Sequence, residues 1–404
     1  MATPTSTETK ASGAAANTVT LEHINVPPAQ TWNYLRVNET SIEVPRVRGG
    51  EANLPTRLTN IETAIGNDAT AWIDSAIYEP RLISVPANEQ LEEPVLVEVE
   101  SDRGELSSTG VVLHEGSRAS VIVIVADTDR TAAGELDERA AESGHDVMVP
   151  EVGKSIAENV PEPVSGSQVR ISLDRRAHVD VYEYVLTPDT CRHIESLAIE
   201  LGEEASADVH QYLLGGKFTA AGVACNLKGD RSNFELTTRY FVDGGEKLDM
   251  NYLARQRGRS TRVNIDASGV VSEHAEKTLC DTIDLVCGCK GSRGDENETV
   301  VLTGEHMVNR SLPTILCDEE DVEGNHGATI GSMSAEQLQY LLDRGLTTEE
   351  AEELFADAIM DDAAMHAPIV KVREAVMKRA AQIQGDAKIS DLSEVIDEMT
   401  GLEA

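Results

Sequence analysis

The chain of 404 residues contains 71 acidic and 34 basic residues, and its formal net charge at pH 7 is −37. A charge this negative repels the phosphate groups of nucleic acids and of anionic membranes, so the sequence argues against both as partners. Hydrophobic residues make up 40% of the chain, which favours a folded protein with a large core over an acidic disordered chain.

The first 79 residues carry weak structural signals. Residues 1–25 include MATPTSTETKASGAAANT, which lacks the apolar core of an export signal, so we expect a disordered leader there. Residues 26–79 include the mixed segment TWNYLRV with Trp32 and Tyr34, and we expect them to form an N-terminal cap. No apolar run in the sequence reaches the roughly 18 residues of a membrane-spanning helix. We therefore expect a cytoplasmic protein.

Residues 80–331 are rich in short runs of β-branched or alternating residues, which are typical of strands. In the run TRVNIDA, Val263, Ile265 and Ala267 should face a core while the residues between them face water. Clusters of Gly, Asp, Asn and Ser separate the runs, and we interpret one of them, SRGDEN at 292–297, as a turn. The predicted strands are residues 94–100, 120–125, 178–186, 208–214, 236–242, 261–267 and 298–304.

Many short strands without helices between them exclude a βαβ architecture and leave a sandwich, a barrel or a β-solenoid. A single sandwich rarely accommodates a strand region this long, whereas a β-helix grows by stacking further coils. We detect no clear internal repeat, so the β-helix prediction depends on length and strand density. Residues 126–168 interrupt the strands and are acidic and rich in small residues, and we expect a solvated, partly helical insertion.

From residue 332 the apolar spacing becomes helical, and we expect residues 332–404 to form a helical domain. Ser334 and Thr347 each begin a capping-box pattern, and Gly345 between them is a typical C-terminal cap. The predicted helices are residues 335–345, residues 348–365, a helix between Pro368 and Gly385, and a short helix within ISDLSEVIDEMTG. The apolar side of the second helix should consist of Leu354, Phe355, Ala358 and Ile359.

The composition also indicates a solvent of high salt concentration. Arg outnumbers Lys by 24 to 10, and aromatic residues make up only 3% of the chain. Acid-rich chains that are poor in lysine and aromatic residues are typical of proteins from salt-loving microbes. Because 1 M salt shortens the Debye length to roughly 3 Å, the self-repulsion of such a chain is screened at high salt. We expect the fold to weaken at low salt.

Motifs of several enzyme classes are absent from the sequence, including GxxxxGK[ST], G-x-S-x-G and H-E-x-x-H. Their absence argues against an NTPase, a serine hydrolase and a zinc protease. Cys287, Cys289 and Cys317 suggest a thiolate site for zinc or an iron–sulfur cluster. Their spacing matches no standard zinc or ferredoxin pattern, which favours the alternative that they are small core side chains.

The stretch EGNHGATIG places His326 among small residues where the strands give way to helices. Gly324, Gly327 and Ala328 leave room for another backbone or another protein to approach closely. Histidine is a common metal ligand, and near neutral pH it either donates or accepts hydrogen bonds. The local sequence leaves a structural and a functional role open and favours the structural one.

Two neighbouring segments, DVEGNHGATIG (321–331) and SAEQLQYLLDRGLTTEEAEELF, resemble the C-terminal signature of the SufB/SufD family of iron–sulfur cluster assembly scaffolds. In that family a D-V-x-x-x-H-G-A-T-x-G segment closes the β-helix, and a helix with a Y-L-x-x-R-G-like segment follows. LTGEHMVNRSLPTILCDEEDV is similar to the family's preceding strands, and TWNYLRV to its W-x-Y-x-R cap. The H-G-A-T sequence is closer to the SufD branch than to SufB, which carries H-E-A-T there.

The resemblance implies a right-handed parallel β-helix with a short N-terminal cap and a C-terminal helical domain. It also implies a non-catalytic scaffold subunit of the SUF system, paired with a SufB-like subunit and served by a SufC-like ATPase. His326 would lie at the subunit interface, facing a cysteine of the partner. The chain would hold no stable cofactor, only a transient iron–sulfur cluster shared with that partner. The residues implied at the ATPase interface are Tyr340, Leu341, Arg344 and Phe355.

Two alternatives stay open at this point. The chain could be a SufB-like or homodimeric scaffold subunit, which the same motifs would also fit. More remotely, it could be a β-helix enzyme acting on carbohydrates, although such enzymes are usually exported and bind sugars on aromatic side chains. The low aromatic content and the missing export signal weigh against that second alternative.

Overall fold

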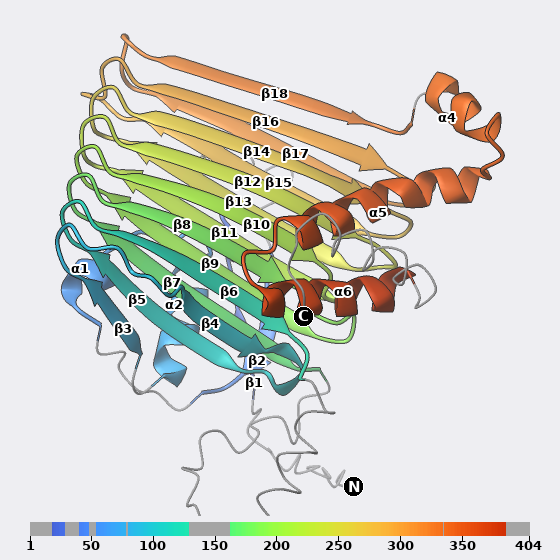
Figure 1. Cartoon of the computed structure of the whole chain (residues 1–404), viewed down its shortest axis with the longest axis horizontal. Helices are drawn as coiled ribbons and strands as arrows, with labels where there is room; N and C mark the ends of the chain where they lie inside the picture. The colour runs from blue at the N-terminus through green and yellow to red at the C-terminus, as the bar shows by residue number, and fades with distance from the viewer. Residues whose placement is uncertain are drawn as a thin grey trace, which may run out of the picture.

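Two parallel β-sheets stack into a β-solenoid, as predicted (Figure 1). The computed structural model describes residues 18–28, 40–47, 54–77, 80–128, 162–333 and 335–384. The even-numbered sheet consists of β4 (Val95–Glu100), β6 (Arg118–Ala126), β8 (His178–Val185), β10 (Ser206–Leu214), β12 (Asn233–Val242), β14 (Arg262–Val271), β16 (Arg293–Leu302) and β18 (Glu323–Gly331). The odd-numbered sheet consists of β3 (Arg81–Val85), β5 (Leu106–Leu113), β7 (Val164–Leu173), β9 (Arg192–Leu201), β11 (Phe218–Leu227), β13 (Lys247–Gln256), β15 (Glu276–Leu285) and β17 (Val308–Cys317).

Each coil adds one strand to each sheet, and the strands of neighbouring coils pair in parallel register. The inward positions stack in columns, so that Val209 lies over Val181 and under Leu236 in the interior between the sheets. In β14 the expected alternation is confirmed: Val263, Ile265 and Ala267 are buried, while Arg262 and Asn264 are exposed. These aliphatic columns form the main hydrophobic core.

All seven strands predicted from the sequence belong to the even-numbered sheet, and the odd-numbered sheet was missed. The reason is burial: β7, β9, β11, β13 and β15 are buried on both faces, so no alternation of polar and apolar residues marks them. The interpretation of SRGDEN as a turn was also wrong, because β16 begins at Arg293 and includes most of that segment. Its carboxylates therefore lie within the sheet.

The outer face of the odd-numbered sheet is covered by N-terminal elements. They are the antiparallel pair β1 (Thr18–Leu21) and β2 (Ile42–Pro45), with α1 (Thr56–Thr59) and α2 (Asn67–Ala76). Trp72 of α2 donates a hydrogen bond from Nε1 to the Pro45 carbonyl at 2.9 Å and so joins the helix α2 to the strand β2. Because β1 lies within residues 1–25, the predicted leader is too long at its C-terminal end. Trp32 and Tyr34 lie outside the described residues.

The predicted insertion at residues 126–168 is also too wide, since Ala126 ends β6 and Val164 begins β7. Residues 129–161, which hold most of it, lie outside the described ranges. A short 3₁₀ helix, Ser101–Arg103, connects β4 to β5. None of the helices in the described ranges is long and apolar enough to cross a membrane.

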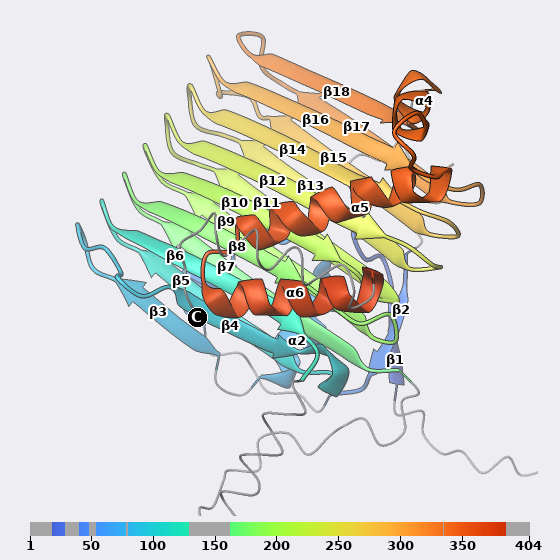
Figure 2. The ribbon, with the colours of Figure 1, turned by 45° about the vertical axis from the view of Figure 1, so that its right-hand side comes forward.

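The C-terminal helices α4 (Ala335–Leu342), α5 (Thr348–Met365) and α6 (Val370–Gln384) follow the solenoid, and α5 and α6 lie across the even-numbered sheet (Figure 2). The capping box at Thr347 is confirmed: its hydroxyl accepts from the Glu350 N–H, and the Glu350 carboxylate accepts from the Thr347 N–H. Gly345 has φ of +96°, as expected of a helix-ending glycine. The last predicted helix, within 389–401, lies outside the described residues.

The apolar side predicted for α5 was partly wrong. Leu354 and Ala358 are exposed, and the helix buries mainly small residues against the sheet. Tyrosines of the sheet fill the space that larger helix side chains would need, and Tyr184 donates its hydroxyl to the Ala363 carbonyl at 3.3 Å. The buried residues of α5 are Ala351, Ala356, Ile359, Met360, Ala363 and Ala364.

Candidate functional site

The candidate site lies at the open end of the solenoid, where β17 and β18 are the last strands of their sheets. Within the described ranges, β18 pairs with β16 alone, so one edge of its backbone has no strand partner. Most of its residues are exposed. Such an edge presents unpaired N–H and C=O groups that can pair with another chain.

His326 is the fourth residue of β18 and is exposed. The parallel register places it beside Glu296 of β16, which is buried at 4% exposure. Paired residues on neighbouring strands project to the same face of a sheet. His326 therefore continues an inward column, in which Ile265 precedes Glu296, and it ends that column at the open end.

The coil beneath His326 has carboxyl groups in its interior. Glu296 and Asp281 of β15 are both buried and share a hydrogen bond between their carboxyl groups. Burial raises the pKa of Glu296, and the hydrogen bond to Asp281 raises it further. Burial also raises the pKa of Asp281, although less. Near neutral pH Glu296 is therefore the protonated member of the pair and donates to the Asp281 carboxylate.

A buried ion pair lies next to these carboxyl groups. Lys277 of β15 contacts the Glu298 carboxylate of β16, and Tyr240 donates its hydroxyl to the same carboxylate at 3.2 Å. The lysine Nζ also lies 3.3 Å from Ser311 Oγ, which belongs to the terminal coil. Burial lowers the pKa of Lys277, while the Glu298 carboxylate opposes that shift. The last coils thus enclose polar and charged groups at inward positions, and the column of Glu298 also holds the buried Thr238, Gln211 and Glu183 in the middle coils.

The small residues around His326 differ in their surroundings. A Cβ added to Gly324 would lie 3.1 Å from Ile315 Cγ2, so the chain itself uses part of that space. A Cβ added to Gly327 would lie 3.1 Å from Asn297 Oδ1. Ala328 pairs in register with Glu298 and follows the same inward side as His326. That these three residues let a partner approach closely stays a prediction.

The structure does not bring Cys287, Cys289 and Cys317 together as a set of metal ligands. Among the described residues, the one group of three Cys, His, Asp or Glu ligand atoms within 4.8 Å of one another is His178, Asp180 and Asp208, on the outer face of the solenoid. Cys289 is buried in the main core, which fits the core alternative. Cys287 and Cys317 are exposed and free, and the Cys317 thiol lies 3.2 Å from the Glu319 carbonyl.

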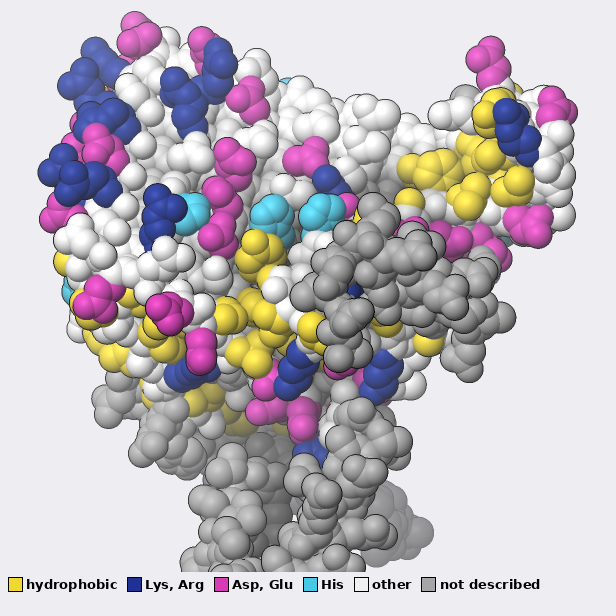
Figure 3. Space-filling model, in the orientation of Figure 1, with side chains coloured by type: hydrophobic (Ala, Val, Ile, Leu, Met, Phe, Trp, Pro, Cys, Tyr) yellow, Lys and Arg dark blue, Asp and Glu magenta, His cyan; other side chains and the backbone are white. Residues whose placement is uncertain are grey.

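A second surface lies on the C-terminal helices. Residues of α4 and α5 line a hollow of about 640 Å³ that includes Tyr340, Leu341 and Phe355. Tyr340 is 56% exposed, and α4 has no buried residue. The Arg344 guanidinium stacks on the Tyr340 ring at 3.3 Å and also donates to the Tyr340 carbonyl. Apolar side chains gather at this end of the molecule (Figure 3). Of the four residues expected at an ATPase interface, Tyr340 and Leu341 lie on α4, Phe355 lies on the adjoining α5, and Arg344 lies in the turn that follows α4.

Sequence reasoning missed Lys277, Asp281, Glu296 and Glu298. The available signal was the spacing of the two glutamates: Glu296 and Glu298 are four and two residues before Val300, which is buried on the same inward side. Alternation would have placed both carboxylates inside the solenoid once β16 was recognised as a strand.

Residues 140–359 match the family model described as "SUF system FeS cluster assembly, SufBD core domain". The chain is similar to the iron–sulfur cluster assembly protein SufD of Escherichia coli, with 21% identity over 255 residues that cover 61% of this chain and 60% of that protein. It is 26% identical to SufD of Bacillus subtilis over 151 residues, covering 37% and 34% of the two chains. It is also 22% identical over 310 residues to an iron–sulfur cluster assembly SufBD family protein of Mycobacterium tuberculosis, covering 74% and 72%. The matches thus span less than two thirds of either SufD protein.

Proposed function

The chain belongs to the SufBD family of the SUF iron–sulfur cluster assembly system, and from this membership we propose that it is a scaffold subunit of the SufD type. In this proposal the chain is not itself an enzyme. It forms a complex with a SufB-like subunit and a SufC-like ATPase, and iron–sulfur clusters are assembled at the interface with the SufB-like subunit.

The observation that carries the proposal is the exposed His326 on the free edge of the last coil. Strand edges with unpaired backbone groups bind other chains by β-pairing, which gives a partner an aligned row of hydrogen bonds. Ile330 on the same strand is 46% exposed and offers apolar contact. A partner docked on β18 would lie against the His326 imidazole. The imidazole could then hydrogen-bond or bind iron together with a cysteine of the SufB-like subunit.

The hollow between α4 and α5 supports a second contact. An amphipathic helix that leaves its apolar side uncovered is typical of a groove for a partner's helix or loop. We assign Tyr340, Leu341, Arg344 and Phe355 to the contact with the ATPase subunit. The energy for assembly would then come from that subunit, which agrees with the absence of a phosphate-binding loop motif in this chain.

Family membership leaves a carbohydrate-active β-helix enzyme without support, and we do not propose it. A homodimer is a different outcome of the same geometry, since the β18 edge could pair with a second copy. The cluster itself would be transient and shared between subunits.

Co-purification tests the proposal. The tagged chain, co-expressed with the SufB-like and SufC-like subunits of its own organism and purified in high salt, should elute as a complex with both. Multi-angle light scattering should then separate a heteromer from a homodimer. Recovery of this chain alone, or as a homodimer that excludes both partners, would contradict the proposal.

The role of His326 needs a separate readout. Substitution of His326→Ala should leave the mass of the complex unchanged and lower the visible absorbance of the cluster formed from iron and sulfide. His306→Ala is the matched control, because His306 is also exposed and lies in the connection that follows β16. Equal cluster yield from the two variants would show that His326 takes no part in cluster assembly.

A further inference from the structure

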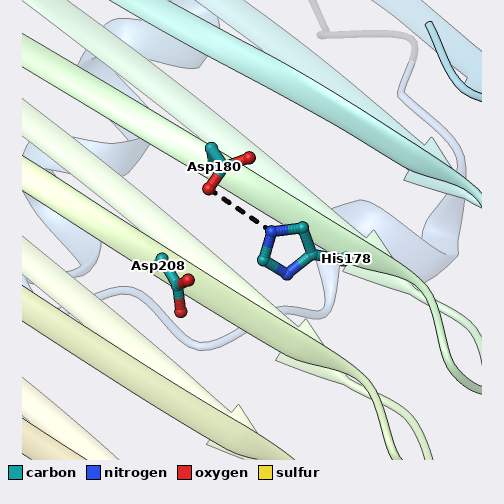
Figure 4. Close-up of side chains that lie close together, drawn as sticks. All are labelled: His178, Asp180 and Asp208. Carbon is teal, nitrogen blue, oxygen red and sulfur yellow. Dashed lines mark ion pairs between the residues drawn. The ribbon is translucent and has the colours of Figure 1, made fainter.

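His178, Asp180 and Asp208 meet on the outer face of the even-numbered sheet, apart from the open end. His178 and Asp180 belong to β8, and Asp208 belongs to β10, where it pairs in register with Asp180. One ligand atom from each side chain lies within 4.8 Å of the other two. The three side chains form a triangle on the strand surface (Figure 4). Atoms bound to one metal ion at about 2.1 Å are separated by roughly 3–4 Å, so small rotations would close this triangle around an ion.

The imidazole of His178 is oriented as a metal-binding ring would be. Its Nδ1 lies 2.7 Å from Ser206 Oγ, a residue that pairs with His178 in register. Its Nε2 lies 3.3 Å from the Asp180 carboxylate. If Nδ1 donates to Ser206, the lone pair of Nε2 lies on the side of the Asp180 carboxylate, which is how outer hydrogen bonds prepare histidine ligands.

The negative charge at this place is poorly balanced. Asp180, Asp208 and Glu235 occupy consecutive rungs of the sheet, where like charges directly opposite one another are destabilising. Within the described part of the chain, Asp208 has neither a hydrogen-bond nor an ion-pair partner for its side chain. Arg118 lies on the rung before His178 but makes no ion pair within 4.0 Å with a described residue.

We propose that His178, Asp180 and Asp208 form a binding site for a divalent transition metal ion. One imidazole and two carboxylates are ligands that zinc and ferrous iron accept, whereas magnesium and calcium prefer oxygen ligands alone. Three protein ligands leave coordination positions open on the solvent side, so the ion would be exchangeable. The site lies on the opposite strand surface from His326 and does not depend on the scaffold function, so either proposal can fail without the other.

Zinc titration of the full-length protein tests the site. Isothermal titration calorimetry in high salt, with a large excess of magnesium, should show one zinc ion per chain. Substitution of His178→Ala removes a ligand without changing the carboxylate charge, and Asp208→Asn removes a ligand with almost no change in shape. Both should weaken zinc binding at least about ten-fold. Cobalt(II) bound to the wild-type protein should give visible absorption bands that both variants lose.

Glu235→Gln is the matched control. It removes one negative charge from the same ladder but lies outside the triad, so zinc affinity should change by less than about two-fold in high salt. Circular dichroism should show that all three variants are folded. The proposal is overturned if no stoichiometric zinc binds in excess magnesium. It is also overturned if Glu235→Gln weakens binding as much as Asp208→Asn while His178→Ala has no effect, since that pattern is nonspecific attraction to an acidic surface.

Discussion

His326 and Glu296 occupy the same column on neighbouring strands, so the exposed histidine at the open end lies over a buried carboxyl group. Glu296 is held protonated by burial and by its hydrogen bond to Asp281. The imidazole thus has a neutral, hydrogen-bonded carboxyl group beneath it rather than a full negative charge. Because the Glu296 carboxyl group is neutral, it does not hold the His326 imidazole in an ion pair. The imidazole can therefore bind a ligand that arrives from the solvent side.

This assignment predicts how Glu296 tolerates substitution. Glu296→Gln keeps a neutral donor toward Asp281 and should change the free energy of unfolding by less than about 1 kcal/mol. Glu296→Ala leaves Asp281 without its donor in a buried site and should cost about 1–3 kcal/mol. Guanidinium unfolding at constant high ionic strength checks both values. Equal destabilisation by the two variants would show that Glu296 is ionised in the folded protein.

The Lys277–Glu298 pair predicts a non-additive response. Lys277→Met leaves the Glu298 carboxylate buried without its cation and should cost about 3–5 kcal/mol. The double variant Lys277→Met, Glu298→Gln removes both charges and should recover most of that loss, because Gln still accepts from the Tyr240 hydroxyl. A double-mutant cycle from unfolding free energies measures the coupling. Additive losses would mean that the two side chains act independently.

The sequence predicted one sheet of the solenoid and missed the other for a physical reason. The strands of the even-numbered sheet alternate because part of their outer face is solvated, as β14 illustrates with buried Val263 and exposed Asn264. The middle strands of the odd-numbered sheet, such as β7, β9 and β11, lie under the N-terminal elements and are buried on both faces. β9 even buries His193 and Glu195, which hydrogen-bond to each other at 2.9 Å. Polar residues of this kind are taken for surface positions when the sequence is read alone.

The internal repeat was missed for a related reason. Neighbouring coils place equivalent residues 26 to 32 positions apart, except across the insertion, where the offset is 60. Thr238 and Gln211 are in contact at an offset of 27, and Asn297 and Asp266 at an offset of 31. The coils differ in length, and an inward position requires a side chain that can be buried rather than one particular residue. The sequence therefore shows no fixed repeat motif. The candidate site was predicted only in part: the family signature indicated His326, whereas its buried surroundings required the register of β16 and β18.

The contribution of Asp249 to stability should fall as pH rises from about 4 through about 6. Asp249 is buried beneath the N-terminal elements, where it accepts hydrogen bonds from Thr40 and Asn25. Burial raises its pKa to about 6, which those hydrogen bonds partly oppose. A raised folded-state pKa means that the folded protein holds more protons than the unfolded chain, so stability is greatest below the unfolded pKa near 4 and declines through about pH 6.

The Asp249 contribution should be about 1–3 kcal/mol between pH 4.5 and pH 7. Unfolding at a series of pH values in 2 M KCl measures it, since screening suppresses the contribution of net charge. Asp249→Asn should flatten this part of the profile, because Asn does not titrate. A wild-type stability that rises between pH 5 and pH 7, or an unchanged slope in the variant, would contradict the assignment.

Salt should stabilise the fold at neutral pH. With a net charge of −37, the compact state suffers strong self-repulsion that screening relieves. The midpoint of thermal unfolding should therefore rise by more than about 10 °C between 0.1 and 2 M KCl. The same series at pH 5, near the sequence pI of about 4.5, should show a much smaller increase. An equal increase at both pH values would indicate a general salt effect on apolar burial instead of charge screening.

Tyr340 should matter for partner binding and not for stability. Its side chain is 56% exposed on α4 and contacts mainly the Arg344 guanidinium, so Tyr340→Ala should change the unfolding free energy by less than about 0.5 kcal/mol. If the α4–α5 hollow receives the ATPase subunit, loss of this large aromatic side chain should weaken that contact by 2 kcal/mol or more, about thirty-fold in Kd. Leu354→Ala is the matched control, because Leu354 is an exposed apolar residue of α5 outside the hollow. Surface plasmon resonance with the immobilised ATPase subunit would measure both variants. Equal affinities for Tyr340→Ala and wild type would show that the ATPase subunit binds another part of the chain. The contact of the SufB-like subunit at β18 is tested separately by His326→Ala.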